Sequence, residues 1–212
     1  RLSLVGSEMC IRDRANAAFF TIFYVPMVPI IIFIFKKDFL HWSVWPSVVL
    51  CLIGGYLLTN FQDATVRLGD TLVVLGALFW STHIIFTGMI IKKYNLPLTI
   101  GAIQTLLVAL FSFIIGLFSE EFVIENILNE IDSILYAGIL SGGFAFVLQI
   151  YAQRNITPAP AAIIFSLEGV FATIAAWFLL NQILGINNLL GCFFILSGVL
   201  LSQLVPLIRK AS

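Results

Sequence analysis

The stretch PAPAAIIFSLEGVFATIAAWFLL occupies residues 158–180 and decides the class of fold. It is long enough to cross a bilayer as a helix, which takes about 20 apolar residues, and its one charged residue is Glu168. Thr157 and Pro158 form a typical N-cap and first-turn pair, so we expect the helix to begin there. The carboxylate in the middle of an apolar helix has to be explained by its surroundings in the rest of the chain.

The whole chain has the composition of a membrane protein. Of its 212 residues, 60% are hydrophobic and 10% are charged, whereas soluble domains are about half apolar and about a quarter charged. Seven apolar segments each approach the length of a membrane-spanning helix, and six of them contain no Asp, Glu, Lys or Arg. They cover residues 17–35, 43–59, 71–91, 97–118, 134–153, 160–180 and 186–206. The sequence therefore predicts an all-α polytopic membrane protein with seven transmembrane helices.

Several classes of function are disfavoured by the same sequence. The formal net charge is zero, which gives no indication of a nucleic-acid partner. The three cysteines are too scattered for a disulfide framework or a metal site. Neither HExxH nor GxSxG occurs, so a membrane-embedded enzyme is only a remote alternative. We expect no enzymatic activity, cofactor or metal, and we expect the partners to be the lipid bilayer and a small-molecule substrate.

Positive charges predict the orientation in the membrane. Seven of them fall in alternate connections and in the C-terminal tail, and Arg67 falls on the other side. The seven are Lys36, Lys37, Lys92, Lys93, Arg154, Arg209 and Lys210. Because Lys and Arg collect on the cytoplasmic side, we expect a multi-pass protein of the inner (cytoplasmic) membrane with a cytoplasmic C-terminus. The acidic connection 119–133 would lie outside, either as a short interfacial helix or without regular structure.

Residues 1–14, RLSLVGSEMCIRDR, match neither a signal peptide nor a transmembrane helix. They resemble a linker-derived stretch that recurs at the ends of assembled reading frames, and we expect them to be an artefact. A genuine cytoplasmic tail is the alternative, although the predicted orientation places Ala15 outside.

Two pairs of helices align without a gap when the chain is shifted by 144 positions. The first helices read AAFFTIFYVPMVPIIIFIF and AAIIFSLEGVFATIAAWFL, and the match places Tyr24 on Glu168. The second helices read SVVLCLIGGYLL and GCFFILSGVLLS, and the match places Gly54 on Gly198. Because five predicted helices lie within the shift, the second copy is inverted, which is the plan of many secondary transporters.

Three stretches carry a more specific resemblance. GDTLVVLGALFWSTHIIFTGMIIKKYN, from residue 69, resembles the opening of an EamA domain. PAAIIFSLEGVFATIAAWFLLNQ, followed by LLGCFFILSGVLL, is similar to its closing part, and FYVPMVP resembles a segment of the first copy. Gly169 stands where the family usually has proline, and we expect it to soften the helix. Asn181 and Gln182 replace the usual Gly-Glu turn.

The EamA family belongs to the drug/metabolite transporter (DMT) superfamily. The resemblance implies ten helices in two inverted five-helix repeats, with both termini in the cytoplasm. It assigns residues 15–60 to the last two helices of the first repeat, 68–206 to a complete second repeat, and 207–212 to a cytoplasmic tail. Three helices of the first repeat would then be absent, so we expect an N-terminally truncated, seven-helix remnant of the ten-helix fold.

The residues of segment 160–180 divide between two faces of a helical wheel. Small residues share one stripe, with Glu168 beside it, and large apolar residues lie opposite. The stripe comprises Ala162, Ser166, Gly169, Thr173 and Ala176, and the opposite side comprises Ile163, Leu167, Val170, Phe171, Ile174, Trp177 and Phe178. Because membrane helices pack through small residues, we expect Glu168 to point towards the bundle or a cavity, and the large side chains to face lipid.

Polar and aromatic side chains within the apolar segments are the candidate substrate-binding residues. They are Tyr24, Trp80, His83, Gln104, Gln149 and Glu168. Glu168 is also the candidate for proton coupling, because a carboxylate inside a membrane costs roughly 2–3 kcal/mol or more on insertion scales. A neutral carboxyl that only fixes helix packing fits the pattern equally well. His83 is more typical of an interhelical hydrogen bond than of a proton relay, and the GxxxG at Gly138 and Gly142 is more typical of packing than of a gate.

The leading hypothesis is a secondary transporter that exports small metabolites or drugs by alternating access, with proton coupling as an option. The alternative is a non-transporting membrane subunit or a lipid-linked-sugar flippase of the same superfamily. Association into a homodimer is compatible with either.

Overall fold

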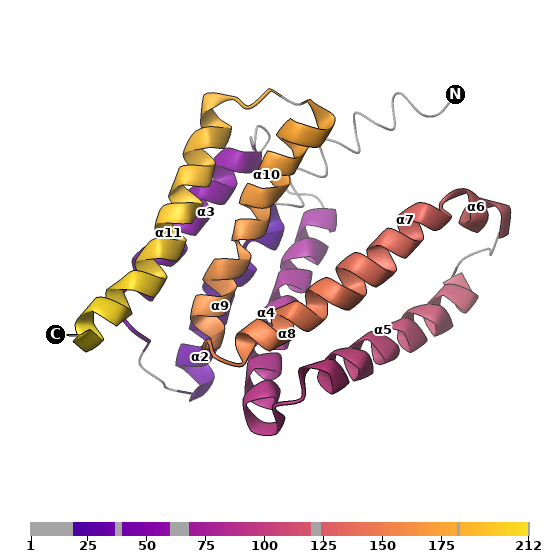
Figure 1. Ribbon diagram of the computed structural model, residues 1–212, viewed down its shortest axis with the longest axis horizontal. Coiled ribbons are helices and arrows are strands. Elements are labelled where there is room, and N and C mark those ends of the chain that lie inside the picture. Colours follow the sequence, from indigo (N-terminus) through magenta and orange to yellow (C-terminus); the bar gives the residue numbers. More distant parts are fainter. Residues whose placement is uncertain (1–18, 37–39, 60–67, 120–123, 182, 212) are drawn as a thin grey trace. The chain divides into compact units, whose positions relative to one another are not determined.

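A computed structural model describes residues 19–36, 40–59, 68–119, 124–181 and 183–211 (Figure 1). All regular structure within these ranges is helical. Five helical spans among the described residues are long and apolar enough to cross a membrane, and the shorter apolar helices Phe19–Phe35 and Val44–Thr59 come before them. The all-α polytopic membrane fold is thereby confirmed. The segment 1–14 and residues Lys37, Arg67 and Gln182, on which sequence predictions were based, lie outside the described residues.

The observed helices lie within a few residues of the seven predicted segments. Their bounds are α2 Tyr24–Lys36, α3 Val44–Thr59, α4 Leu68–Tyr94, α5 Pro97–Ser119, α6 Ile124–Asn129, α7 Ile131–Leu135, α8 Phe146–Gln153, α9 Pro158–Phe165, α10 Leu167–Leu180 and α11 Ile186–Ala211. A π-helical stretch, Tyr136–Ala145, joins α7 to α8, so that Ile131–Gln153 runs as one span. The short helix α6 lies in the acidic connection, which favours the helical alternative for that segment.

Two helices end on an asparagine in the left-handed conformation. Asn95 follows α4 with φ 56°, and Asn181 follows α10 with φ 51°. Asparagine tolerates this conformation better than any residue except glycine, which makes it the second choice for a helix C-cap. Asn181 therefore ends α10 at the position where the EamA pattern has glycine. Asparagine in place of glycine still allows the left-handed turn at this position.

The chain divides into two compact units, each described here by itself. The first contains α2, α3, α9, α10, α11 and the part of α4 up to Phe86; the second contains Thr87–Ile156. The core of the first unit lies where α2, α3, α9 and α11 meet. Its fully buried apolar side chains include Val25, Val28, Cys51, Ala159, Ala162, Ile163 and Ile195. Small and β-branched residues dominate this core, as expected where membrane helices approach closely.

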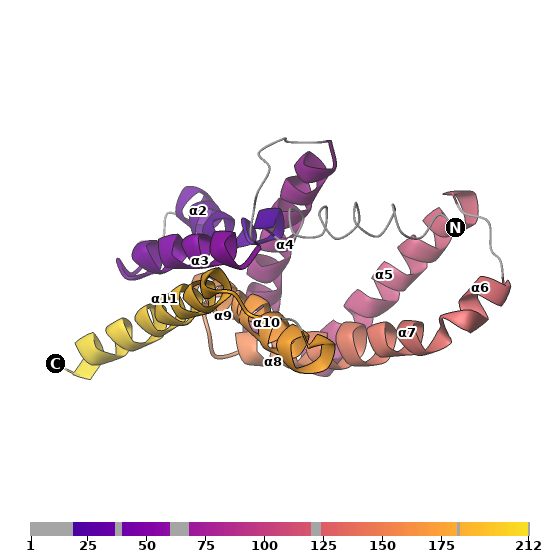
Figure 2. The ribbon, with the colours of Figure 1, turned by 90° about the horizontal axis from the view of Figure 1, so that it is seen from above.

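The tightest packing in the first unit is between α3 and α11, which lie side by side in Figure 2. A Cβ atom added to Gly54 would lie 2.6 Å from Ile195 Cγ1 and 2.7 Å from the Gly191 carbonyl oxygen. A Cβ atom added to Gly198 would lie 2.9 Å from both Cys51 Sγ and the Ser47 carbonyl oxygen. Glycine is required at both positions because only its lack of a side chain allows the two backbones to come this close.

The same contacts have an approximate two-fold symmetry. Gly54 on α3 meets Gly191 and Ile195 on α11, and Gly198 on α11 meets Ser47 and Cys51 on α3. The shift of 144 positions places Gly54 on Gly198, Ser47 on Gly191 and Cys51 on Ile195. Each contact therefore has its exchanged counterpart, as in an isologous interface between antiparallel helices. The predicted repeat boundaries themselves stay predictions.

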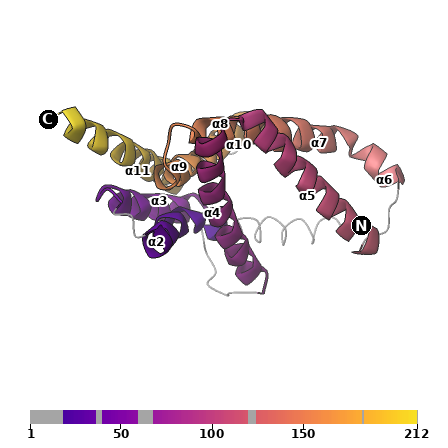
Figure 3. The same cartoon turned by 90° about the horizontal axis from the view of Figure 1, so that it is seen from below.

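In the second unit, α5 packs against α8 and the two arms then diverge towards α6 (Figure 3). The contact is made at Gly101, where an added Cβ atom would lie 2.8 Å from Val147 Cγ2. Gly138 and Gly142 lie in the π-helical stretch. No atom within 4 Å of an added Cβ at either position belongs to another described helix. The predicted helix packing through this GxxxG is therefore not found within the described residues.

Candidate functional site

The membrane span that carries Glu168 is interrupted shortly before its middle. Where the sequence predicts one continuous helix, the structure has α9 and α10 separated at Ser166. Thr157 is the N-cap residue and Pro158 the first residue of α9, as predicted. The backbone N–H of Gly169 donates to the Ser166 carbonyl at 3.2 Å, a contact of the tighter i to i+3 kind. Glu168 consequently lies in the first turn of α10.

The Ser166 side chain accounts for the position of this interruption. Its hydroxyl donates to the Ile163 carbonyl at 2.6 Å and lies 3.4 Å from Cys51 Sγ on α3. A serine that bonds back to the preceding turn competes with the regular helical hydrogen bonds and bends helices. Ser166 is buried, so the interruption is held against α3 within the first unit.

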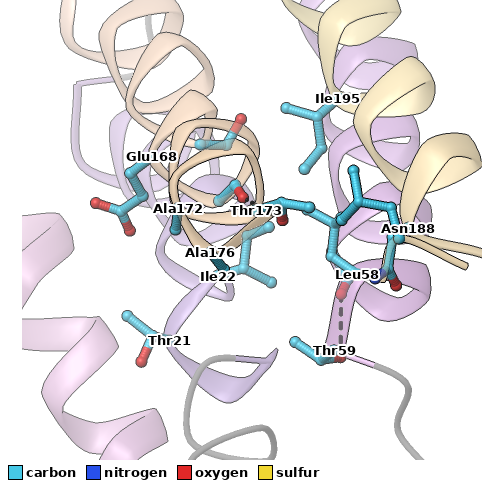
Figure 4. Close-up of a pocket in the computed structure, with 14 residues that line it drawn as sticks. Thr21, Ile22, Leu58, Thr59, Glu168, Ala172, Thr173, Ala176, Asn188 and Ile195 are labelled. Carbon is cyan, nitrogen blue, oxygen red and sulfur yellow. Dashed lines mark hydrogen bonds between the residues drawn. The ribbon is translucent and has the colours of Figure 1, made fainter. Parts of the chain in front are cut away.

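A cavity of about 860 Å³ opens beside this interruption (Figure 4). Its walls come from α3, α10 and α11, together with Thr21 and Ile22 ahead of α2. The volume falls within the range of about 300–1,000 Å³ that is usual for small-molecule sites. Ile22, Leu58, Leu184 and Ile195 make much of the lining apolar. The cavity is therefore the candidate functional site.

Glu168 is the sole charged side chain among the described residues that line the cavity. Its carboxylate extends from one side of α10, while Thr173 and Ala176 face Leu58 and Asn188 on the other side (Figure 4). The side chain is exposed, so a ligand in the cavity can reach it. A lone carboxylate in an otherwise neutral cavity gives the site a negative potential that attracts cations.

Besides Ser166, two of the lining hydroxyl groups are bonded to their own helices. Thr59 donates to the Gly55 carbonyl at 3.0 Å (dashed line in Figure 4), and Thr173 donates to the Gly169 carbonyl at 2.8 Å. A hydroxyl group has one proton, so both side chains can only accept hydrogen bonds from a ligand.

Tyr24 lies inside the protein rather than on the cavity wall. Only 2% of the residue is exposed, and its hydroxyl has no hydrogen-bond partner among the described residues. The Glu168 carboxylate is close enough to this hydroxyl to interact with it electrostatically. The two residues that the repeat places on each other therefore lie within electrostatic range of one another in the first unit. Ser81 on α4 donates to the backbone carbonyl of Tyr24 at 3.4 Å.

Trp80 and His83 form a stacked pair on α4. Their ring centroids are 5.0 Å apart and the rings are inclined by 15°. Both residues are half-buried, and neither belongs to the described lining of the cavity. The structure therefore brings the two aromatic candidates Trp80 and His83 together, away from the described lining of the cavity.

Gln104 and Gln149 belong to the second unit. Gln104 donates from Nε2 to the Thr87 hydroxyl at 3.2 Å, which ties α5 to the end of α4. Gln149 on α8 is half-buried and its Nε2 atom is enclosed without a hydrogen-bond partner among the described residues. Their assignment to the substrate site stays a prediction.

The predicted division of faces on α9 and α10 needs one correction. Ile163 and Val170, expected to face lipid, are 0% and 5% exposed. Ile163 lies on α9, which packs against α2, α3 and α11, and Val170 lies on α10, which packs against α3, α9 and α11, so neighbouring helices cover both positions. Phe171, Ile174, Trp177 and Phe178 are exposed as expected.

Thr21, Thr59 and Asn188 line the cavity but were not among the sequence-predicted site residues. Asn188 could have been found, because it is an amide within the last apolar segment. The two threonines fall near the ends of their segments, where polar residues are common, and carry no such signal. Among the described residues, no group of three or more His, Cys, Asp or Glu side chains is placed to hold a metal ion.

These features define a polytopic α-helical membrane protein with an open, mostly apolar cavity that contains one carboxylate. The EamA-like transporter family matches residues 67–204, and the chain belongs to this family. The family's description and the names of several relatives point to transporters rather than to enzymes.

Three relatives illustrate the similarity. A transporter of Archaeoglobus fulgidus is 30% identical over 195 residues, which cover 89% of this chain and 60% of the relative. The Bacillus subtilis transporter YoaV is 26% identical over 167 residues, covering 76% of this chain and 55% of the relative. The Arabidopsis thaliana protein WALLS ARE THIN 1 is 26% identical over 160 residues, covering 72% of this chain and 39% of the relative. The chain thus spans between about two fifths and three fifths of these proteins.

Proposed function

We propose that this chain forms the substrate-binding part of a secondary transporter that exports small organic cations with an apolar body. The observation that carries the proposal is the cavity of about 860 Å³ in which Glu168 is the sole charge among the described lining residues. The apolar lining removes the body of a substrate from water, and the carboxylate supplies the counter-charge. Membership of a transporter family supports transport rather than binding alone.

Glu168 is also the residue through which we propose coupling to protons. A carboxylate within a membrane span is costly to leave unpaired, and it is stabilised either by a bound cation or by a proton. Competition between the two at one carboxylate couples the exit of a cation to the entry of a proton. The Tyr24 hydroxyl is buried, lies within electrostatic range of this carboxylate and has no hydrogen-bond partner among the described residues, so it is one group that a change of state could engage.

Alternating access fits the packing of α3 against α11. The contacts at Gly54 and at Gly198 are related by the approximate two-fold symmetry, as contacts between a pair of inverted repeats would be. In transporters of this plan, one repeat moves against the other around a site near the middle of the membrane. We propose that the α3–α11 contact stays closed while the cavity beside α10 changes its access.

We further propose that the protein lies in the cytoplasmic membrane with its C-terminus in the cytoplasm. The support is the distribution of Lys and Arg, which places Lys36, Lys92, Arg154 and Arg209 on one side of the alternating spans.

The test is uptake of a radiolabelled organic amine into proteoliposomes that contain the protein, with and without an imposed pH gradient. Glu168→Gln is expected to lower the initial rate at least about tenfold, because a hydrogen bond to a charged group contributes about 1.5–3 kcal/mol. Glu125→Gln is the matched control, since Glu125 is an exposed carboxylate on α6, and it is expected to leave the rate unchanged.

Tyr24→Phe, which removes only the hydroxyl, serves as a second variant and is expected to slow uptake. An uptake rate that Glu168→Gln leaves unchanged would remove the carboxylate from the mechanism. A wild-type rate independent of the pH gradient would remove proton coupling while leaving cation recognition in place.

A further inference from the structure

The two threonines on the wall of the cavity away from Glu168 have no hydroxyl proton left for a ligand. Thr59 and Thr173 line this wall, and each uses its single hydroxyl proton on a carbonyl of its own helix, at 3.0 Å to Gly55 and 2.8 Å to Gly169. Thr59 also lies 3.2 Å from the Tyr56 carbonyl, a second acceptor for the same proton. Toward a ligand, both side chains therefore present oxygen lone pairs alone.

These acceptors lie on a different side of α10 from the carboxylate. Thr173 follows Glu168 by five residues, which corresponds to about 140° around the helix and about 7.5 Å along it. Figure 4 shows Glu168 on one side of α10 and Thr173 facing Leu58 and Asn188 on the other. One ammonium group is therefore too small to contact both, although a substrate that fills the cavity can reach both at once.

We propose that the cavity selects bifunctional amines: molecules with an ammonium group at Glu168 and a second hydrogen-bond donor, such as a phenol, hydroxyl or second amine, at Thr59 and Thr173. The inference rests on the proposed function and adds the second point of recognition. A methyl ether in place of the second donor has no proton to donate. The hydroxyl oxygens of Thr59 and Thr173 have no free proton either, so no hydrogen bond forms between them and the ether. Burying polar oxygen atoms without a hydrogen bond is unfavourable, so the site binds an amine with a second donor more tightly than the corresponding methyl ether.

Asn188 lies on the same wall and its amide can both donate and accept. Its N–H groups can donate to the oxygen of a phenol and to that of a methyl ether alike, so the preference is set by the acceptors Thr59 and Thr173. The apolar side chains of Leu58 and Ile195, which line the same wall, suit the ring or chain that joins the two polar ends.

The experiment is calorimetric binding to the full chain in lipid nanodiscs, with three probes of matched size. Tyramine carries both an ammonium and a phenol, 4-methoxyphenethylamine lacks the second donor, and 3-(4-hydroxyphenyl)propanoate lacks the cation. Tyramine is expected to bind about fivefold more tightly than the methyl ether, the difference that a neutral hydrogen bond makes. The propanoate is expected to show no binding at the same concentrations.

Two sets of variants identify the groups responsible. The double variant Thr59→Val/Thr173→Val keeps the shape of both side chains and is expected to bring the two amines to equal affinity. Thr59→Ser/Thr173→Ser restores the hydroxyls and is expected to restore the preference, which excludes misfolding as its cause. Thr82→Val is the matched control, because the Thr82 hydroxyl also donates to its own helix, at 2.7 Å to Phe79, and does not line the described cavity.

The outcomes separate the inference from the function on which it rests. If the two amines bind equally to the wild type, and Glu168→Gln weakens both about tenfold, the second point of recognition is wrong and cation recognition stands. A tyramine preference that persists in the Thr59→Val/Thr173→Val variant also overturns the inference. If Glu168→Gln changes the affinity of neither amine, or none of the three probes binds, the cavity is not the cation site and both proposals fall together.

Discussion

At the scale of single residues, Glu168 and Asn181 mark the beginning and the end of α10. Glu168 lines the cavity because Ser166 interrupts the helix just before it and the small residues around it leave space. Asn181 ends the helix in the left-handed conformation, with φ 51°. The first residue bears on function and the second on stability, and each can be tested by a small substitution.

Asn181→Ala is expected to destabilise the protein by about 1 kcal/mol, because a residue with a Cβ atom pays that cost in the left-handed region. Asn181→Gly is the matched substitution and is expected to leave the stability unchanged or to raise it slightly. The measurement is the thermal unfolding temperature in detergent, followed by tryptophan fluorescence. A lower unfolding temperature for the glycine variant than for the alanine variant would contradict the assigned conformation.

At the scale of helices, the contact between α3 and α11 depends on glycine. The sequence repeat places Gly54 on Gly198, and both prove to be points of closest approach between the two helices. A Cβ atom at Gly54 would lie 2.7 Å from the Gly191 carbonyl oxygen, a backbone atom that cannot move without the helix.

Gly54→Ala is therefore expected to cost about 1–3 kcal/mol through overpacking, with a corresponding drop in the unfolding temperature. Gly76→Ala is the control, since an added Cβ there has nothing within 4 Å and alanine favours a helix. The prediction fails if the two substitutions change the unfolding temperature equally.

Helix positions and the carboxylate could be predicted from the sequence because both are strong local signals. A run of about 20 apolar residues has few alternatives to a spanning helix, and Glu168 is conspicuous inside one. The interruption at Ser166 could not be predicted, because serine is also common inside regular membrane helices. Ile163 and Val170 were placed wrongly, since a wheel shows which residues share a face but not how many neighbours the helix has.

At the scale of the whole molecule, the arrangement of charged residues predicts the direction in which the chain crosses the membrane. A green fluorescent protein fused after Ser212 is expected to be fluorescent, because it folds in the cytoplasm. Alkaline phosphatase fused at the same position is expected to be inactive, because it needs disulfides that do not persist there. Active phosphatase at this position would reverse the orientation. Exchanging Arg209 and Lys210 for Gln should leave the result unchanged, since five further positive charges lie in the connections on that side.

The site could be predicted only in part, for a reason that also belongs to this scale. Spacing along one helix shows which residues share a face, and the sequence accordingly places Thr173 in the small-residue stripe and Glu168 beside it, both on the cavity wall. Thr21, Thr59 and Asn188 come from three other segments, and only the packing of α3 against α11 brings the last two to one wall. The helical stripe on α4 correctly placed Trp80 and His83 next to each other. It could not show that neither residue belongs to the described lining of the cavity.

The central claim, that the cavity beside α10 binds the substrate, is tested most directly by protection of a cysteine placed within it. In a background with Cys10, Cys51 and Cys192 replaced by alanine, Thr173→Cys is labelled with a membrane-impermeant methanethiosulfonate reagent, with and without tyramine. Tyramine is predicted to slow the labelling of Thr173→Cys, to lose this effect when Glu168→Gln is added, and to leave Thr82→Cys unaffected. Labelling of Thr173→Cys at the same rate with and without tyramine, in protein that binds tyramine, would contradict the claim.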